Sequence, residues 1–261
     1  ALPIYLGAES TTAGVIAQIT VISINDAPVL VDDNPVLTAI AEDDLNSPGD
    51  PVAAIVVDGS ITDADGAAVE AIAITAVDDS NGTWQFSTDN GLSWRSIDDG
   101  SLAVGHALLL DGTLTGAGTQ KLRFVPNADY NGTATVTFRA WDKTSGSAGT
   151  YADTSTSGGT SAFSSTIDAA RITVTPVNDT PVGVPAITGI SAEDQVLTAD
   201  ISAIADADGL GAFSYQWFRD AAAIGGATAS TYTLGDDDVG AQISVQVSYI
   251  DAQGTGEGPL T

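Results

Sequence analysis

Two copies of one short motif divide this sequence and constrain its fold more than any other feature. They read Asn25-Asp26-Ala27-Pro28 and Asn178-Asp179-Thr180-Pro181, and they lie 153 residues apart. An alternating run rich in β-branched residues precedes each copy, over residues 17–23 and 170–175. A period of two places alternate side chains on one face of a strand. Each run therefore predicts a strand that ends at a linker, and the spacing predicts a boundary between modules.

Acidic landmarks recur in the same order after each motif. Glu42-Asp43-Asp44 follows the first motif, and Glu193-Asp194 follows the second at a similar place. In the same way, Asp63-Ala64-Asp65-Gly66 after the first motif corresponds to Asp206-Ala207-Asp208-Gly209 after the second. Between them lie short runs with strand patterning and Gly, Asn and Asp turns, and no apolar pattern keeps a helical period. We therefore expect an all-β chain of tandem Greek-key β-sandwich domains. The expected division is a terminal strand of a preceding or split domain plus linker over 1–28, one sandwich over 29–181, and a second over 182–261 that lacks its last strand.

The acidic composition limits the partners and the chemistry of this chain. Of its 261 residues, 34 are acidic and only 7 are Lys or Arg, which gives a formal charge of -27. That field repels nucleic acid and anionic membrane surfaces and attracts divalent cations. Most of the acidic residues are Asp, which forms turns and binds calcium. Cysteine is absent, which excludes disulfides and thiolate sites, and no long apolar run predicts insertion into a membrane or a leader.

The order of these landmarks, completed by Ala140-Trp141-Asp142, resembles the cadherin-like repeats of giant bacterial RTX adhesins. Residues 182–261 resemble the immunoglobulin-like repeats of the same adhesins, through Ser214-Tyr215-Gln216-Trp217 and Ser230-Thr231-Tyr232-Thr233-Leu234. The resemblance implies a secreted, extracellular protein attached to the outer surface of a Gram-negative bacterium. It also implies a rigid extender or scaffold for cell adhesion and biofilm formation. Such a segment would be a monomer whose partners are neighbouring repeats of the same polypeptide.

The same resemblance implies Ca2+ as the bound ion, held where consecutive domains meet. Calcium takes about six to eight oxygen ligands, which clustered Asp residues around a Gly turn can supply. Carried over position by position, the ligands at the first junction are Asn25, Asp26, Glu42, Asp43, Asp63, Asp65 and Asp142. Those at the second junction are Asn178, Asp179, Glu193, Asp194, Asp206, Asp208 and Asp251. The alternative is that these residues form turns on a solvated surface.

Residues 145–165 form a Gly-, Ser- and Thr-rich stretch that we expect to be a long loop of the first sandwich. Long loops often carry binding surfaces. The alternative function is therefore a ligand-binding module of the adhesin tip, which recognises a host-surface glycan or peptide through this loop and exposed aromatics such as Tyr151. Disorder or simple loop variation explains the composition equally well. The four tryptophans are expected inside the cores: Trp84, Trp94, Trp141 and Trp217.

Two features raise the question of catalysis, and neither nominates a site. Residues 87–94 match the Asp-box hairpin of sialidases, but this is one hairpin, and no facing pair of carboxylates can be chosen. His106 is the only histidine, lies in an apolar run, and belongs to no Ser-His-Asp arrangement. We therefore expect no catalytic residues and no enzyme.

Overall fold

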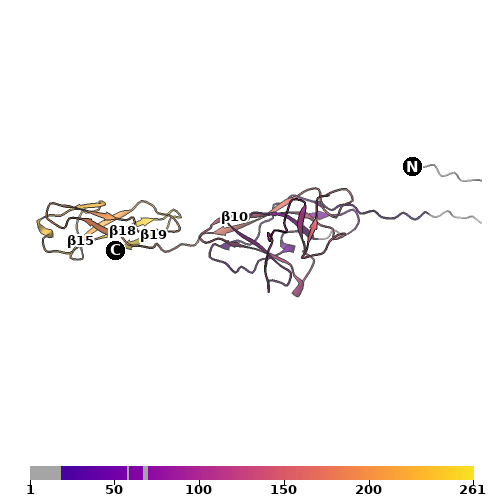
Figure 1. Ribbon diagram of the computed structural model, residues 1–261, viewed down its shortest axis with the longest axis horizontal. Coiled ribbons are helices and arrows are strands. Elements are labelled where there is room, and N and C mark those ends of the chain that lie inside the picture. The colour runs from indigo at the N-terminus through magenta and orange to yellow at the C-terminus, as the bar shows by residue number, and fades with distance from the viewer. Residues whose placement is uncertain (1–18, 58, 67–69) are drawn as a thin grey trace, which may run out of the picture.

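The computed structural model describes residues 19–57, 59–66 and 70–261, and these residues fold almost entirely into β-structure. Figure 1 shows two lobes arranged end to end, a larger one that contains β10 and a smaller one that contains β15, β18 and β19. The helical elements within the described ranges are single 3-10 turns: Val52–Ala54, Gly116–Gly118 and Asp236–Asp238. The expected all-β sandwich class is confirmed. In the same ranges no helix has the length and apolar character needed to cross a membrane.

The larger lobe consists of two main sheets. One has the strand order β11 (Tyr151–Asp153), β8 (His106–Asp111), β5 (Ala71–Val77), β10 (Gly132–Ala140), β12 (Asp168–Thr175) and β2 (Ile40–Ala41). The other has the order β3 (Asp50–Pro51), β9 (Lys121–Pro126), β6 (Gly82–Ser87) and β7 (Arg95–Ser96). A separate pair joins β1 (Val29–Leu30) to β4 (Ile61–Thr62). Strands β2 and β12 run parallel, whereas the other pairs are antiparallel.

The core of this lobe lies between the two main sheets. Every second residue of β10 from Ala134 to Ala140 is buried, and β9 and β12 alternate in the same way. Trp84 of β6 and Phe124 of β9 have ring centroids 5.3 Å apart, and both belong to one buried cluster with Phe138 of β10. Both sheets therefore bury their facing sides in a shared core, as a sandwich requires.

Trp94 is an exception to the expectation that all four tryptophans lie in cores. It is half-buried, and the guanidinium carbon of Arg123 lies 4.3 Å from the centroid of its ring. Arg123 is on the face of β9 turned away from the core, because its neighbours Leu122 and Phe124 are the fully buried ones. The Trp94 ring therefore covers the outer face of the smaller sheet, where the cation stabilises it.

The stretch 145–165 covers the outer face of the six-stranded sheet. Phe163 is only 3% exposed and packs in a cluster with Ala73 of β5 and Leu109 of β8. Trp141 joins this cluster and donates its Nε1–H to the Ser145 carbonyl at 2.7 Å. Strands β5 and β8 are consequently buried on both faces, which explains their continuous apolar runs.

Tyr151, which we expected to be an exposed aromatic on this stretch, is half-buried. Its ring packs against the main core, and its hydroxyl donates a hydrogen bond to the Ile97 carbonyl. Burial raises the pKa of the Tyr151 hydroxyl to about 12, with a further contribution from the charge of Asp99. Tyr151 is thus a packing residue, and the expectation that it lies open for ligand recognition is wrong.

The smaller lobe is a second sandwich. One sheet has the order β13 (Ala186–Gly189), β14 (Val196–Asp200) and β17 (Thr231–Thr233), and the other β16 (Ala222–Ala223), β15 (Ser214–Arg219), β18 (Ile243–Ile250) and β19 (Gly256–Leu260). Trp217 of β15 is fully buried, stacks on Tyr232 of β17 at 5.6 Å, and donates its Nε1–H to the Ala229 carbonyl at 2.9 Å. We expected the last strand to be absent, but β19 follows β18 and pairs with its second half, from Val247 onward.

Candidate metal centre

The linker between the two lobes is held from both sides by acidic side chains. The Asp179 backbone N–H donates to Asp208 Oδ2 of the smaller lobe at 2.6 Å. The Val177 backbone N–H donates to Glu42 Oε1 of the larger lobe, also at 2.6 Å. Glu42 comes directly after β2 and is 2% exposed, so its carboxylate is fixed at the end of the core. Each lobe therefore presents one buried carboxylate to the same short stretch of chain.

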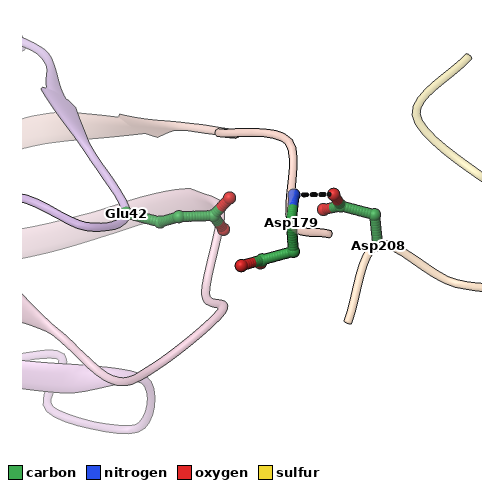
Figure 2. A group of neighbouring side chains, drawn as sticks. All are labelled: Glu42, Asp179 and Asp208. Carbon is green, nitrogen blue, oxygen red and sulfur yellow. Dashed lines mark hydrogen bonds between the residues drawn. The ribbon is translucent and has the colours of Figure 1, made fainter. Parts of the chain in front are cut away.

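These side chains form a compact acidic cluster. One carboxylate oxygen from each of Glu42, Asp179 and Asp208 lies within 4.8 Å of the other two. Figure 2 shows the three side chains and the hydrogen bond from the Asp179 nitrogen to Asp208. At about 4 Å and an effective dielectric of about 20, two like charges repel by about 4 kcal/mol. Desolvation and the negative charges of Asp129 and Asp208 raise the pKa of Asp179, as expected for crowded carboxylates. A cation among these oxygens would turn the repulsion into attraction.

Asp251 brings a further carboxylate to this end of the smaller lobe. It follows β18, is 5% exposed, and its Oδ1 accepts backbone N–H groups of Gln253 and Thr255 at 2.9 and 2.7 Å. Its Oδ2 is buried and has no hydrogen-bond partner. The next residue, Ala252, donates its N–H to the Asp208 carbonyl at 3.2 Å, which places this turn beside the cluster. An unpartnered buried carboxylate oxygen is costly, and a cation is a partner that would relieve this cost.

Asp206 orders the cluster from the side of the smaller lobe. Its Oδ1 accepts the Asp208 backbone N–H at 3.0 Å, and its Oδ2 accepts the hydroxyl hydrogen of Tyr249. Tyr249 is a core residue of β18 whose pKa is raised by burial and by this hydrogen bond to Asp206. Asn178 of the linker adds a contact at the second junction, where its side-chain N–H donates to Glu257 Oε1 of the smaller lobe at 3.0 Å. The turn that presents Asp208 is thus anchored to the core beneath it.

The donor chemistry of the cluster identifies the class of ion that it suits. Glu42, Asp179, Asp208 and Asp251 offer only carboxylate oxygens, which are the ligands of hard cations such as calcium and magnesium. Neither nitrogen nor sulfur is offered by these residues, which argues against zinc. The residues present therefore fit a divalent cation bound through oxygen.

The first junction repeats the backbone pattern of the second. The Asp26 N–H donates to Asp65 Oδ2 at 2.6 Å, and the Asp65 N–H to Asp63 Oδ1 at 2.9 Å. Asn25 donates its side-chain N–H to Asp142 Oδ2 at 2.9 Å. In sequence and in these bonds, Asp26, Asp63 and Asp65 correspond to Asp179, Asp206 and Asp208. Within the described residues, however, three carboxylates come within 4.8 Å of one another only at the second junction.

The early acidic pairs do not lie where we expected them. Glu42 was assigned to the first junction but belongs to the second, where Asp43 lies exposed and adds negative charge near Asp179. Glu193 and Asp194 were assigned to the second junction but lie at the opposite end of their lobe. There the Glu193 carboxyl pairs with Asp236, which raises the pKa of Glu193, and the Asp194 N–H donates to the Leu234 carbonyl at 3.0 Å.

The physical reason is the length of the strands between the landmarks. Asn131, at the start of β10, donates its side-chain N–H to Glu42 Oε2 at 3.2 Å, whereas Asp142 follows the end of the same strand. Nine strand residues span about 30 Å, so Glu42 and Asp142 are at opposite ends of one module. Glu193 and Asp251 are separated by β18 in the same way.

Three contributors to the site were missed by the sequence argument. Asn131 contacts Glu42, Gln253 donates its side-chain N–H to Asp208 Oδ1, and the charge of Asp129 acts on Asp179. Asn131 precedes a glycine, a dipeptide that indicates a turn, and nothing in the sequence marks the other two residues as neighbours of the linker.

In comparisons with known proteins, no family model and no curated protein matches this sequence, so the assignment of this site rests on the geometry described above.

Proposed function

We propose that this chain is a calcium-stabilised segment of a secreted bacterial surface adhesin, in which sandwich modules act as a rigid extender for cell adhesion and biofilm formation. The observation that carries the proposal is the acidic cluster between the lobes. It unites a carboxylate from each lobe, Glu42 and Asp208, with Asp179 of the linker between them. The resemblance to cadherin-like and immunoglobulin-like repeats, stated above, supplies the adhesin context.

Calcium suits the cluster better than magnesium does. Magnesium requires near-ideal octahedral geometry and keeps most of its water, whereas calcium accepts irregular sets of carboxylates. Here the carboxylates come from three separate stretches of chain, and Asp251 adds a buried oxygen without a partner. When bound, the ion would supply positive charge that relieves the repulsion among them. The protein would contribute the positions of the oxygens, fixed by the strands that end beside them.

The end-to-end arrangement of the lobes explains how such a site would serve an extender. Figure 1 shows a narrow connection between the lobes. Because Glu42 belongs to one lobe and Asp208 to the other, binding one ion through both would restrict bending at that connection. A stiffened series of modules could hold a distal binding domain away from the cell surface.

The test is a calcium titration of the whole chain, followed by calorimetry and by thermal unfolding. Extracellular calcium modules bind with dissociation constants of about 0.1 to 1 mM, and at about 100 times that concentration one site adds about 2.7 kcal/mol to the free energy of unfolding. Asp208→Asn should weaken calcium binding by roughly 10-fold or more, as expected for loss of a ligand or its support. In chelator this substitution removes a repelling charge and also one of the two hydrogen bonds that Asp208 accepts, so the test is the rise in melting temperature on adding calcium, which should be smaller than that of the wild type.

The matched control is Asp237→Asn, because the Asp237 side chain is 86% exposed and lies away from the joint. This variant should retain the calcium affinity of the wild type. A melting temperature that does not respond to calcium in the wild type would refute the proposal. Equal calcium affinities for the Asp208 and Asp237 variants would refute the assignment of the site.

A further inference from the structure

A tryptophan and two cations share the outer face of the four-stranded sheet of the larger lobe. Lys121 and Arg123 of β9 are half-buried and alternate with the fully buried Leu122, so both side chains point away from the core. Trp94 precedes β7, and its ring centroid lies 4.3 Å from the guanidinium carbon of Arg123. Trp94 belongs to none of the buried apolar clusters of the described residues. We refer to the surface formed by Trp94, Lys121 and Arg123 as the cationic face.

The tryptophan and the lysine are held next to each other by two tight turns. A Cβ atom on Gly91 would lie 3.4 Å from Trp94 Cζ2 and 3.8 Å from Lys121 Cδ, so the indole ring and the lysine stem both border this glycine. A Cβ atom on Gly49 would lie only 2.6 Å from Trp94 Cη2. Pro48, which precedes that glycine, accepts a hydrogen bond from Lys121 Nζ through its carbonyl at 3.3 Å. The ammonium group is therefore fixed beside the edge of the indole ring.

Neutral groups hold the Arg123 guanidinium in place. Its Nε donates to Gln85 Oε1 at 2.8 Å, and its Nη1 donates to Asn46 Oδ1 and to the Ser47 carbonyl, both at 3.2 Å. These bonds leave Nη2 without an acceptor among the described residues. The planar group is also stacked on the Trp94 ring. It is therefore preorganised, and a ligand that accepts from Nη2 would lose little affinity to the ordering of this side chain.

No carboxylate of the described residues forms an ion pair with either of these two cations, although the chain has 34 acidic residues. Lys143 and Arg219, in contrast, each have such a partner. Burial lowers the pKa of Arg123, and the more distant charge of Asp44 offsets this only in part. A partly desolvated cation that lacks an anion is stabilised when an anion from outside binds to it. The cationic face is therefore complementary in charge to an anionic ligand.

We propose that the cationic face binds a glycan whose sugar residues carry carboxylates, such as an oligomer of hexuronic acid. The C–H groups on one side of a sugar ring would lie against the side of the Trp94 ring that Arg123 does not cover. The sugar carboxylate would accept hydrogen bonds from Lys121 Nζ and Arg123 Nη2. An extended acidic peptide fits less well, because it would need unpaired backbone groups. On the face of a sheet those groups are already paired within the sheet.

The formal charge of -27 is compatible with such a ligand. At physiological ionic strength, charges more than about 8 Å apart are largely screened, so a bound sugar carboxylate interacts mainly with Lys121 and Arg123. A long, densely charged polymer such as nucleic acid would also cover acidic surface and stays disfavoured. The proposed site lies on a different surface from the acidic cluster between the lobes and does not depend on a bound cation. It also differs from the stretch 145–165, where we first expected a ligand.

Calorimetric titration of the whole chain with a tetramer of galacturonic acid tests the proposal. The buffer is free of calcium, so that the result does not depend on the proposed metal site. A neutral tetramer of galactose and a peptide of four glutamates are the comparison probes. The wild type should bind the uronate roughly 10-fold or more tightly than either, because only the uronate offers both a sugar ring and a carboxylate. Equal affinity for the neutral sugar, or for the peptide, would overturn the proposal.

Two variants locate the binding on the cationic face. Lys121→Gln should weaken binding of the uronate roughly 10-fold, the loss expected for one hydrogen bond between charged groups. Arg171→Gln is the matched control, because it removes one positive charge from an exposed position on the other sheet, and it should bind as the wild type does. Trp94→Ala should abolish measurable binding. If its melting temperature shows that it does not fold, the Lys121 variant decides the case. Equal affinities for the Lys121 and Arg171 variants would overturn the proposal.

Discussion

Asp89 is the clearest case of a single carboxylate whose protonation should affect folding. It lies in the hairpin between β6 and β7, where the Ser93 N–H donates to its Oδ1 at 2.9 Å and the Ser87 hydroxyl donates at 2.7 Å. Hydrogen bonds from Ser93, and then from Ser87, lower the pKa of Asp89 to about 2. The Asp-box pattern therefore has a local structural explanation here, since the carboxylate closes the turn.

The sign of the pH effect follows from that lowered pKa. A carboxyl group with a depressed pKa in the folded state stabilises the fold above its ordinary pKa, and loses this contribution as the pH falls toward about 2. Asp89→Asn should therefore lower the melting temperature at pH 6, and the difference from the wild type should shrink between about pH 5 and pH 2. Thermal unfolding across this range measures it. A difference that stays constant with pH would contradict the prediction.

Single residues also show where sequence reasoning ends. That Asp carboxylates would be the metal ligands of the second junction could be predicted, because Asp-x-Asp-Gly and Asn-Asp form turns that present carboxylates regardless of what surrounds them. The location of Glu42 could not, because its neighbours Asn131 and Asp179 are distant in sequence and meet it only through sheet pairing. Trp94 was misplaced for a similar reason, since alternation in a short edge strand does not reveal which face a neighbouring sheet covers.

At the scale of elements, the stretch 145–165 gives the sharpest contrast between sequence and structure. Its Gly, Ser and Thr content predicted a loop without a core, yet Phe163 and Trp141 anchor it on β5 and β8. The sequence pattern that indicates this covering lies in the strands beneath. Residues 71–74 and 107–110 are continuous apolar runs, all of them buried, which is typical of strands covered on both faces. Long strands such as β10 and β12 were predictable because their alternation is local.

A prediction about this covering segment follows from its anchor. Phe163→Ala should lower the free energy of unfolding by about 3 to 5 kcal/mol, because a fully packed ring would leave a cavity. Limited proteolysis should then cut within 145–165 sooner than in the wild type. Leu92→Ala is the control, since Leu92 is 86% exposed and should change neither property. If the Phe163 variant melted like the Leu92 variant, the segment would be a free loop after all.

At the scale of the whole molecule, the two junctions differ in what they can control. The second junction has carboxylates from both lobes around one linker. At the first junction the Asp26 N–H is bonded to Asp65 and the Asn25 side chain to Asp142, and these residues belong to one lobe and its own leading segment. A cation at the second junction should therefore fix the angle between the lobes. The same ion at the first should leave that angle unchanged.

Spin labels on exposed positions of the two lobes, Leu92→Cys and Thr228→Cys, allow the angle to be followed by distance measurements. Calcium should narrow the distribution of distances between the labels, and chelator should broaden it, because the repelling carboxylates then favour an open joint. Asp208→Asn should keep the distribution broad in calcium at concentrations that saturate the wild type. Asp65→Asn is the matched control, the same substitution at the equivalent position of the first junction, and it should respond to calcium as the wild type does. If the Asp65 variant also stayed broad, or if the wild-type distribution did not change with calcium, the ion would not be acting as a tie between the lobes.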